Sequence, residues 1–334
     1  MAPLVMASSF NFDSSWPDGQ PSGLGSVNSY PVVGDWIFFP AYLYGTTTKY
    51  NVATGRVEAV VNADTGQNIG GNHVGATAVG DWVYFGGLRT TTIRYNATNG
   101  QVETLADAVT GNNISRYRAG AVYYDGWIYM PSSRNNYAIE RYHVEDQIIE
   151  AIAGTEGNYN GACVYGDRVY FAGKSSDTIY FDTNTGEVRT LADNQGNILG
   201  DRFSDITVHN GWIYLVSSYA KAVRFNVTTG ESQDIDLGLG MMGVAALGDW
   251  VYFAGSAANT SKRYNAVTGV IEELSGVGVG RSGVVAVGDF VYFGSESDIQ
   301  PAARYNTLTG DSEILHDSVD PGSSLLLGNS CVLI

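Results

Sequence analysis

Short apolar runs recur along the chain at nearly constant spacing, and each follows a Gly-Asp pair or a close variant of it. In Gly80-Asp-Trp-Val-Tyr-Phe the four positions after the pair are all large and apolar, so both faces of the predicted strand are buried. Seven clear copies and one eroded copy begin at Gly34, Gly80, Asp125, Gly166, Asn210, Gly248, Gly288 and Gly328. They lie 38 to 46 residues apart, the period of a β-propeller blade.

A second phrase follows each clear copy and predicts a hairpin turn. An aromatic residue and Asn or Asp are followed by Thr-Gly or Asn-Gly, as in Tyr50-Asn-Val-Ala-Thr-Gly. The Asx side chain closes such a turn on its own backbone, and glycine takes the position that needs positive φ. The third repeat departs from the phrase with Tyr142-His-Val-Glu-Asp.

Each repeat therefore predicts four antiparallel strands, A to D in chain order. Strand A carries small residues such as Gly75-Ala-Thr-Ala-Val, which fit the crowded position next to the axis. The fold class predicted is all-β, a propeller of four-stranded blades forming a single domain over residues 1–334.

The two ends of the chain favour eight blades. The C-terminal residues 321–334 supply an extra pair of strands, Ser323–Leu327 and Ser330–Ile334. Within residues 1–26, Ser8-Ser-Phe-Asn-Phe-Asp resembles a third strand. Together they would complete one shared blade and remove the exposed sheet edges. The alternative is seven blades with unattached terminal segments.

The repeats resemble known propeller families. Gly80-Asp-Trp-Val-Tyr-Phe-Gly-Gly, followed by Arg94-Tyr-Asn-Ala-Thr-Asn-Gly, resembles a kelch repeat, although the closing Trp of that pattern is missing. Phe181-Asp-Thr-Asn-Thr-Gly-Glu-Val is similar to the quinoprotein repeat, whose family forms eight-bladed propellers. The resemblance implies the fold and says little about function. Kelch-like propellers are mostly binding scaffolds, and the Cys–Tyr crosslink and His ligands of the copper oxidase members have no counterpart here.

Charge narrows the range of partners. The chain has 18 Lys and Arg against 34 Asp and Glu, a formal net charge of −16. An acidic protein without a basic stripe is not expected to bind nucleic acid or an anionic membrane. The start of the chain lacks the features of a signal peptide, and no apolar run is long enough to span a membrane, so a cytoplasmic location is expected.

The loops predict where a ligand would bind. The A–B and C–D turns share one face and are short and repetitive, whereas the B–C and D–A loops share the other face and vary. We call the second face the upper face. Its B–C loops contribute Tyr42, Arg89, Arg134 and Tyr219, residue types common in carbohydrate and protein recognition.

An alignment of the repeats singles out a column seven residues before each Gly-Asp pair. Its bulky members are His73, Arg118, Tyr159, Phe203, Met241 and Arg281. This mixture of polar and aromatic groups is typical of a small-molecule pocket at the channel mouth. The alternative is that these side chains plug the channel.

Asp205 departs from a second column, two residues closer to the turn, where most repeats have glycine. It is either an ion-pair partner of Arg118 or Arg281, or a polar anchor or general base. An enzyme in this pocket would use Asp205, His73 and Tyr159 as acid–base groups and the two arginines to stabilise charge.

No cofactor or metal site is predicted, because no histidine pair has ligand spacing and neither a Gly-x-Ser-x-Gly elbow nor a P-loop occurs. The D–A loops rich in Asp, Asn and Gly favour turns over Ca²⁺ sites. The last four residues, Cys331, Val332, Leu333 and Ile334, match a prenylation signal, but Cys331 falls in a core-strand column. Cys163 is predicted to lie in the core.

The leading hypothesis is a ligand-binding propeller without catalysis, with a glycan, small polar molecule or protein loop at the upper mouth. The alternatives are an enzyme in the same pocket and a protein-interaction scaffold with a broad upper surface.

Overall fold

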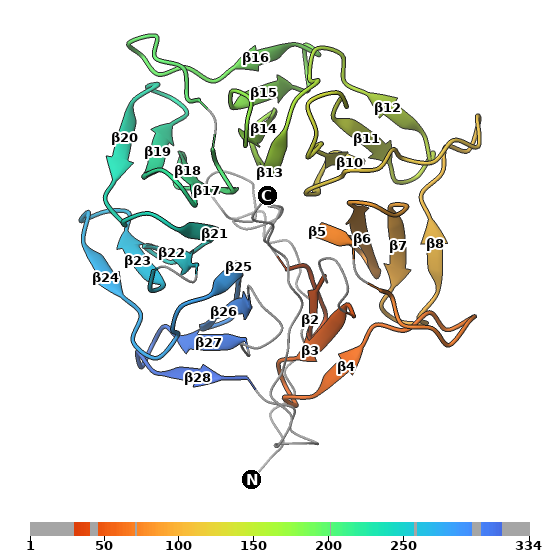
Figure 1. Cartoon of the computed structure of the whole chain (residues 1–334), viewed down its shortest axis with the longest axis horizontal. Coiled ribbons are helices and arrows are strands. Elements are labelled where there is room, and N and C mark those ends of the chain that lie inside the picture. The colour runs from red at the N-terminus through yellow and green to blue at the C-terminus, as the bar shows by residue number, and fades with distance from the viewer. Residues whose placement is uncertain are drawn as a thin grey trace.

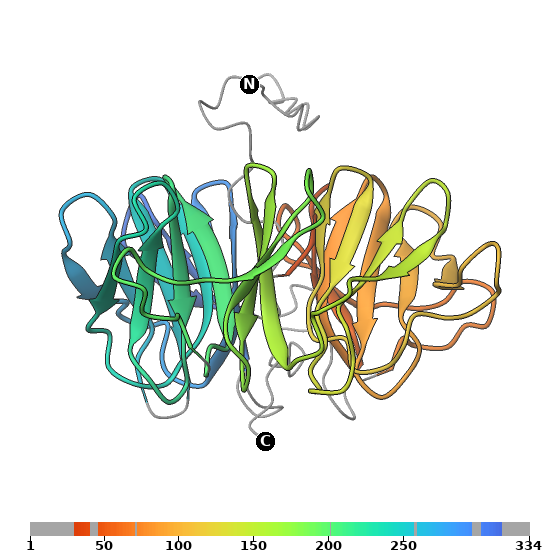
Figure 2. The same ribbon diagram turned by 90° about the horizontal axis from the view of Figure 1, so that it is seen from above.

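The computed structural model describes residues 30–40, 46–70, 72–200, 202–256, 259–295 and 302–315. Seven four-stranded antiparallel sheets surround a central axis, each built from one continuous stretch of chain (Figure 1). Seen edge-on, the ring is a disc with loops on both faces (Figure 2). The all-β fold and the four-stranded blades predicted from the repeats are confirmed.

The strands of each blade run outward from the axis in sequence order. Blade 1 holds β1 (Val32–Val33), β2 (Trp36–Phe39), β3 (Thr48–Asn51) and β4 (Val57–Ala59), and blade 2 holds β5 (His73–Val79), β6 (Trp82–Gly87), β7 (Ile93–Asn96) and β8 (Val102–Thr104). Blade 3 holds β9 (Val122–Tyr124), β10 (Trp127–Met130), β11 (Glu140–His143) and β12 (Ile149–Ala151), and blade 4 holds β13 (Tyr159–Tyr165), β14 (Arg168–Gly173), β15 (Ile179–Asp182) and β16 (Val188–Thr190). Blade 5 holds β17 (Asp205–His209), β18 (Trp212–Val216), β19 (Ala222–Asn226) and β20 (Ser232–Ile235). Blade 6 holds β21 (Met241–Leu247), β22 (Trp250–Gly255), β23 (Lys262–Asn265) and β24 (Ile271–Glu273), and blade 7 holds β25 (Arg281–Val287), β26 (Phe290–Ser295), β27 (Ala303–Asn306) and β28 (Ser312–Ile314).

The core lies between blades, because the second strand of each blade is apolar on both faces. Phe38 of β2, for example, packs with Val83 and Phe85 of β6 in one buried cluster. Close approach at the axis explains the glycines of the first strand. A Cβ on Gly75 would lie 2.6 Å from the Cα of Gly120 in the next blade, well inside van der Waals contact.

The C–D turns have the predicted chemistry. In blade 1, Asn51 Oδ1 accepts hydrogen bonds from the backbone N–H groups of Ala53 (3.1 Å) and Thr54 (2.9 Å), and Gly55 has φ +71°. The divergent third repeat keeps the same turn with other residues. His143 Nδ1 accepts from Asp146 N (3.2 Å), and Gln147 adopts φ +54° in the position of the glycine.

The prediction of eight blades is wrong, because blade 7 packs directly against blade 1. Tyr50 of β3 and Tyr292 of β26 have ring centroids 6.0 Å apart, and both belong to one cluster with Ile37 and Leu315. Tyr30, at the start of blade 1, also places its hydroxyl 3.2 Å from Ser282 Oγ of β25. This contact leaves no room for an eighth blade. The segments expected to share that blade, residues 1–26 and 321–334, lie outside the described residues.

A repeated three-strand contact holds the outer part of the blades. An Arg or Lys of the third strand stacks on the aromatic residue that begins the second strand and bonds to an acidic or amide side chain of the fourth. Arg263 illustrates it: the guanidinium carbon lies 4.0 Å from the Trp250 ring centroid, and Nη2 lies 2.6 Å from Glu272 Oε2. In blade 4 the cation and the aromatic residue have exchanged strands. Arg168 lies on the second strand and Tyr180 on the third, with the guanidinium carbon 4.7 Å from the ring centroid.

Candidate functional site on the upper rim

Backbone hydrogen bonds between the B–C and D–A loops connect neighbouring blades along the upper face. They run from Leu88 N to Asn72 O (2.8 Å), Tyr117 N to Leu88 O (3.1 Å), Ser133 N to Tyr117 O (2.7 Å), Lys174 N to Asn158 O (2.8 Å), Arg202 N to Lys174 O (2.9 Å), Met241 N to Ser217 O (3.0 Å) and Ser256 N to Gly240 O (2.8 Å). We call this set of bonds the rim belt. It satisfies loop backbone groups and gives the side chains on these loops a fixed spacing.

Exposed arginines gather on the rim belt where it crosses blades 2 and 3. Arg89 follows Leu88, Arg116 precedes Tyr117, and Arg134 follows Ser133, so the three lie on adjacent hydrogen-bonded segments. None of the three forms an ion pair with another described residue. Arg89 and Arg134 were predicted as upper-face residues from the loops, whereas Arg116 was not.

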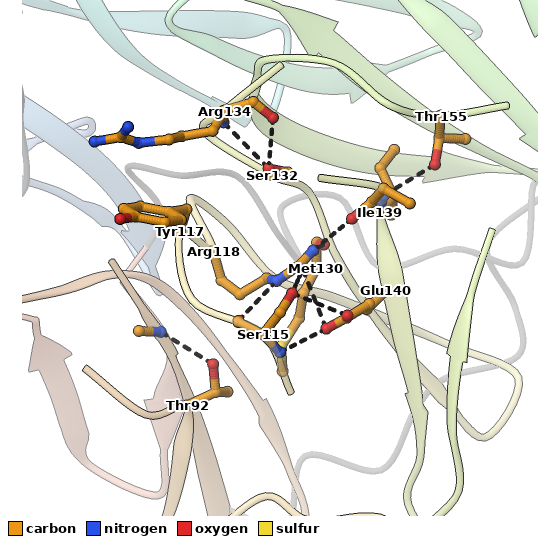
Figure 3. Close-up of polar contacts among 12 residues, drawn as sticks. Thr92, Ser115, Tyr117, Arg118, Met130, Ser132, Arg134, Ile139, Glu140 and Thr155 are labelled. Carbon is orange, nitrogen blue, oxygen red and sulfur yellow. Dashed lines mark hydrogen bonds and ion pairs between the residues drawn. The ribbon is translucent and has the colours of Figure 1, made fainter. Parts of the chain in front are cut away.

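Arg134 and Tyr117 form a stacked pair. The guanidinium carbon lies 4.3 Å from the Tyr117 ring centroid, within the range of cation–π attraction (Figure 3). The Tyr137 ring lies 5.2 Å from the Tyr117 ring at an angle of 58°. Ser132 Oγ accepts from Arg134 N (3.1 Å) and donates to Arg134 O (2.9 Å), which fixes the backbone of the loop. We refer to Arg89, Arg116, Tyr117 and Arg134 as the rim cluster.

Tyr117 has a backbone conformation that costs energy. Its φ is +68°, in the left-handed region, where a residue with a Cβ is less stable than glycine by about 1–2 kcal/mol. Arg202 occupies the equivalent place before blade 5, with φ +80°, and is exposed. Before blades 6 and 7 the same place holds Gly240 and Gly280, which adopt it without that penalty.

Arg118 has a structural set of contacts. The side chain is fully buried, and Nε donates to Ser115 O (3.1 Å) while Nη1 donates to Met130 O (3.1 Å) and Ala138 O (2.8 Å). Nη2 bonds to Ser115 Oγ and lies 3.1 Å from Glu140 Oε2 (Figure 3). Burial lowers the pKa of Arg118, and the Glu140 carboxylate opposes that effect. Arg118 thus pairs with Glu140 rather than with Asp205.

The other members of the channel-mouth column are also buried. Met241, His73, Phe203 and Tyr159 are at most 6% exposed, and Arg281 is 4% exposed. His73 Nδ1 lies 3.1 Å from Gly70 O, and burial lowers the pKa of the imidazole, which favours its neutral form. Burial also raises the pKa of the Tyr159 phenol to about 12. Arg281 donates from Nε to Val277 O (2.8 Å).

Asp205 links blades 5 and 6 near the axis and lies close to blade 4. Its Oδ2 accepts from Val244 N of blade 6 (2.9 Å), and its Oδ1 accepts from Ile206 N (2.8 Å). A Cβ on Gly161 of blade 4 would lie 3.2 Å from Oδ1. The carboxylate therefore occupies the space that the neighbouring glycine leaves. These contacts favour an anchoring role over that of a general base.

The D–A connections that were compared with Ca²⁺ loops form short hairpins that dock on the next blade. In the connection after blade 2, Asp107 Oδ1 accepts from Thr110 N (2.7 Å), and Oδ2 accepts from Ile149 N of blade 3 (2.8 Å). The hydrogen bond from Ile149 is the largest cause that lowers the pKa of Asp107 to about 2. Across the ranges that the structure describes, no three His, Cys, Asp or Glu side chains are placed to hold a metal ion.

The remaining predicted residues are placed as follows. Tyr219 lies in the B–C loop of blade 5 and is 59% exposed. Cys163 of β13 is buried, and burial, with a smaller contribution from the Asp205 carboxylate, raises the pKa of its thiol.

Tyr42 and the Cys331–Ile334 segment lie outside the described residues. No helix in the described part of the chain is long and apolar enough to cross a membrane.

Comparison with known proteins shows the fold alone. No protein-family model matches the chain, and no curated protein matches its sequence. Among solved structures, the computationally designed Ika8 protein is 14% identical with a TM-score of 0.59, over 89% of this chain and 88% of that one. BamB from Moraxella catarrhalis is 15% identical with a TM-score of 0.53, over 81% and 80%. Puromycin hydrolase is 12% identical with a TM-score of 0.55, and the match spans 90% of this chain but only 55% of the hydrolase. At such identities the likeness establishes a β-propeller and no activity.

Proposed function

We propose that the protein is a binding propeller without catalysis and that it takes its ligand on the upper rim of blades 2 and 3. The candidate ligands remain those expected from the sequence: a glycan, a small polar molecule or a loop of a protein. The rim cluster, rather than the channel-mouth column, is the surface that would contact it. The finer kelch-like or quinoprotein-like relationship and the cytoplasmic location are parts of the same proposal.

One observation carries this proposal: the rim arginines differ from the other cations of an acidic chain. On the third strands of blades 1 to 3, Lys49, Arg94 and Arg141 each bond to a glutamate of the fourth strand. Arg89 and Arg116 have no such partner among the described residues, and both side chains are exposed. Exposed cations without a structural contact are available for an external group.

The enzyme hypothesis receives less support from the geometry. Its charge stabiliser Arg118 already binds Glu140 and three backbone carbonyls, and its acid–base candidate Asp205 accepts backbone hydrogen bonds. The scaffold hypothesis is closer to the proposal, because the rim cluster is assembled from separate loops and its three arginines are exposed.

The proposal is tested by comparing ligand capture between variants. The immobilised protein and the variant Arg89→Ser/Arg116→Ser/Arg134→Ser are each screened against a glycan array and a cell extract. Arg189→Ser is the control, since Arg189 is an exposed cation of β16 in the outer strand of blade 4. We expect specific ligands of the unmodified protein and of Arg189→Ser to be lost by the triple variant. Equal capture by all three proteins would contradict the proposal, as would substrate turnover abolished by Asp205→Asn in a protein that remains folded.

A further inference from the structure

One backbone position recurs on the upper rim of blades 2 to 7, the residue directly before each member of the channel-mouth column. Five of these six residues have positive φ: Asn72, Tyr117, Arg202, Gly240 and Gly280, with Asn158 as the exception. Glycine and asparagine are the residues that tolerate this conformation best. Blades 3 and 5 instead carry a tyrosine and an arginine, two bulky side chains with no intrinsic preference for it.

The rim belt explains how these residues are held there. Tyr117 N donates to Leu88 O, and Tyr117 O accepts from Ser133 N, so the strained residue is bonded on both sides. Glycine at this position would allow the same hydrogen bonds. The rim belt therefore requires the positive φ of Tyr117 but not its side chain. Strained residues that persist in this way are concentrated at binding sites. We therefore look to the side chain of Tyr117 for a role outside folding.

The surroundings of Tyr117 identify the chemistry. Arg134 covers one region of its ring at 4.3 Å, and Tyr137 lies against it at 5.2 Å. An aromatic face already stacked in this way is a poor platform for a sugar ring. It instead holds the planar guanidinium of Arg134 in place, and a positioned guanidinium favours two-point binding of a carboxylate. Arg89 and Arg116 add charge on the adjacent segments.

Charge elsewhere limits how long an anionic ligand can be. The chain carries a net charge of −16, and exposed Glu156 and Asp177 lie near Tyr159, beyond Arg134 along the rim. A polyanion such as a nucleic acid would extend from the rim cluster over these acidic surfaces and be repelled. A short acidic segment, with its carboxylates confined to the cluster, meets the arginines alone.

We propose that the rim cluster binds an acidic peptide segment of a partner protein, with aspartate or glutamate side chains on Arg89, Arg116 and Arg134, and with Tyr117 as the residue that positions Arg134. This inference rests on the proposed binding function and narrows its ligand to one class. The arginines supply charge-assisted hydrogen bonds, and the strained Tyr117 orients one of them.

The test compares three fluorescent probes of similar length: a peptide of alternating glutamate and alanine, a sulfated oligosaccharide and a single-stranded oligonucleotide. A glutamine–alanine peptide is the neutral control. We expect the acidic peptide to bind more tightly than every other probe, and binding to weaken with salt. Arg116→Ser and Arg134→Ser should each weaken it by about tenfold, as for the loss of one charge-assisted hydrogen bond, whereas Arg189→Ser should leave it unchanged.

Tyr117→Gly separates binding from folding. If Tyr117 serves recognition, this variant keeps or raises the urea midpoint because strain is relieved, while affinity for the acidic peptide falls. If Tyr117 is only structural, the midpoint falls and peptide affinity is unchanged, which overturns its assignment as a positioning residue.

The probes also distinguish the two proposals. If the oligosaccharide or oligonucleotide binds best and the rim variants abolish that binding, the peptide inference fails and the binding function stands. If the neutral peptide binds as tightly as the acidic one, the peptide inference also fails. If no probe binds and no captured ligand depends on the rim arginines, both proposals fail.

Discussion

Replacing Arg118 by methionine should destabilise the ring strongly, because this side chain fastens three segments of blade 3 together. The methionine side chain keeps much of the apolar length of arginine but has no hydrogen-bond donors. The change removes the bonds to Ser115 in the D–A loop, to the carbonyl of Met130 at the end of β10 and to Glu140 at the start of β11. Each of these groups then loses the Arg118 guanidinium as its partner.

The magnitude follows from burial. Breaking a buried ion pair by removing one partner costs about 3–5 kcal/mol, largely because the other charge is stranded. Arg118 is fully buried and the Glu140 side chain is 17% exposed, so we expect the loss to fall within that range. Each carbonyl that loses its donor adds a penalty of about 1–3 kcal/mol before the structure relaxes. Adding Glu140→Gln to Arg118→Met removes the stranded charge and should recover about 0.5–3 kcal/mol.

Urea unfolding followed by tryptophan fluorescence measures these differences. Arg118→Lys is the matched control: it keeps the charge but not the planar fork, and we expect a loss smaller than that of methionine. If Arg118→Met stays within about 1 kcal/mol of the unmodified protein, the structural assignment of Arg118 is refuted. If in addition that variant loses ligand affinity, the residue belongs to a binding pocket, as the channel-mouth column suggested.

Three further outcomes are expected. Arg263→Ala should lower the free energy of unfolding in urea by about 1–3 kcal/mol, because it removes both the stacking on Trp250 and the ion pair. Glu272→Gln removes only the ion pair and should lower it by less than about 1 kcal/mol. Equal losses in the two variants would contradict a contribution from the stacking. Asp107 has a lowered pKa, so its stabilising contribution is complete above its ordinary value of 3.8 and is lost as pH falls toward about 2. The stability gap between the unmodified protein and Asp107→Asn should therefore shrink over that interval, and a gap independent of pH would contradict the bond to Ile149. Cys163 should react with iodoacetamide only on unfolding, since its thiol is buried; rapid labelling of the native protein would show that β13 opens.

The blades were predictable from sequence because their chemistry is local and repeated. Each Gly-Asp pair, buried second strand and Asx turn specifies its own hairpin, and seven copies specify it consistently. Ring closure is different, because it depends on how Tyr50 packs against Tyr292, which lies 242 positions further along the chain. The terminal segments carry strand-like patterns, but a local pattern does not show whether the ring has room for another blade.

The side chains of the channel-mouth column are buried, and the strand pairing around them is irregular. The column was defined by counting seven residues back from each Gly-Asp pair. The pairing of first and second strands shifts register between His73 and Ala76, between Tyr159 and Gly161 and between Met241 and Gly243. A register shift of this kind changes the direction in which the preceding side chain points. The direction of that side chain therefore does not follow from the strand residues after the shift. Arg89 and Arg134 were found because they lie in loops, and Arg116 was missed because it lies outside the aligned columns.

The direct contact between blade 7 and blade 1 has a consequence for how such a ring can change over generations. Each blade is encoded by one uninterrupted stretch, and none of the described blades borrows a strand from a distant part of the chain. Duplication or deletion of one repeat in the gene would thus add or remove a whole blade, whose buried second strand would pack against the blades on either side. The rim loops would be inherited with it, so a new binding surface and a new blade could arise in a single event.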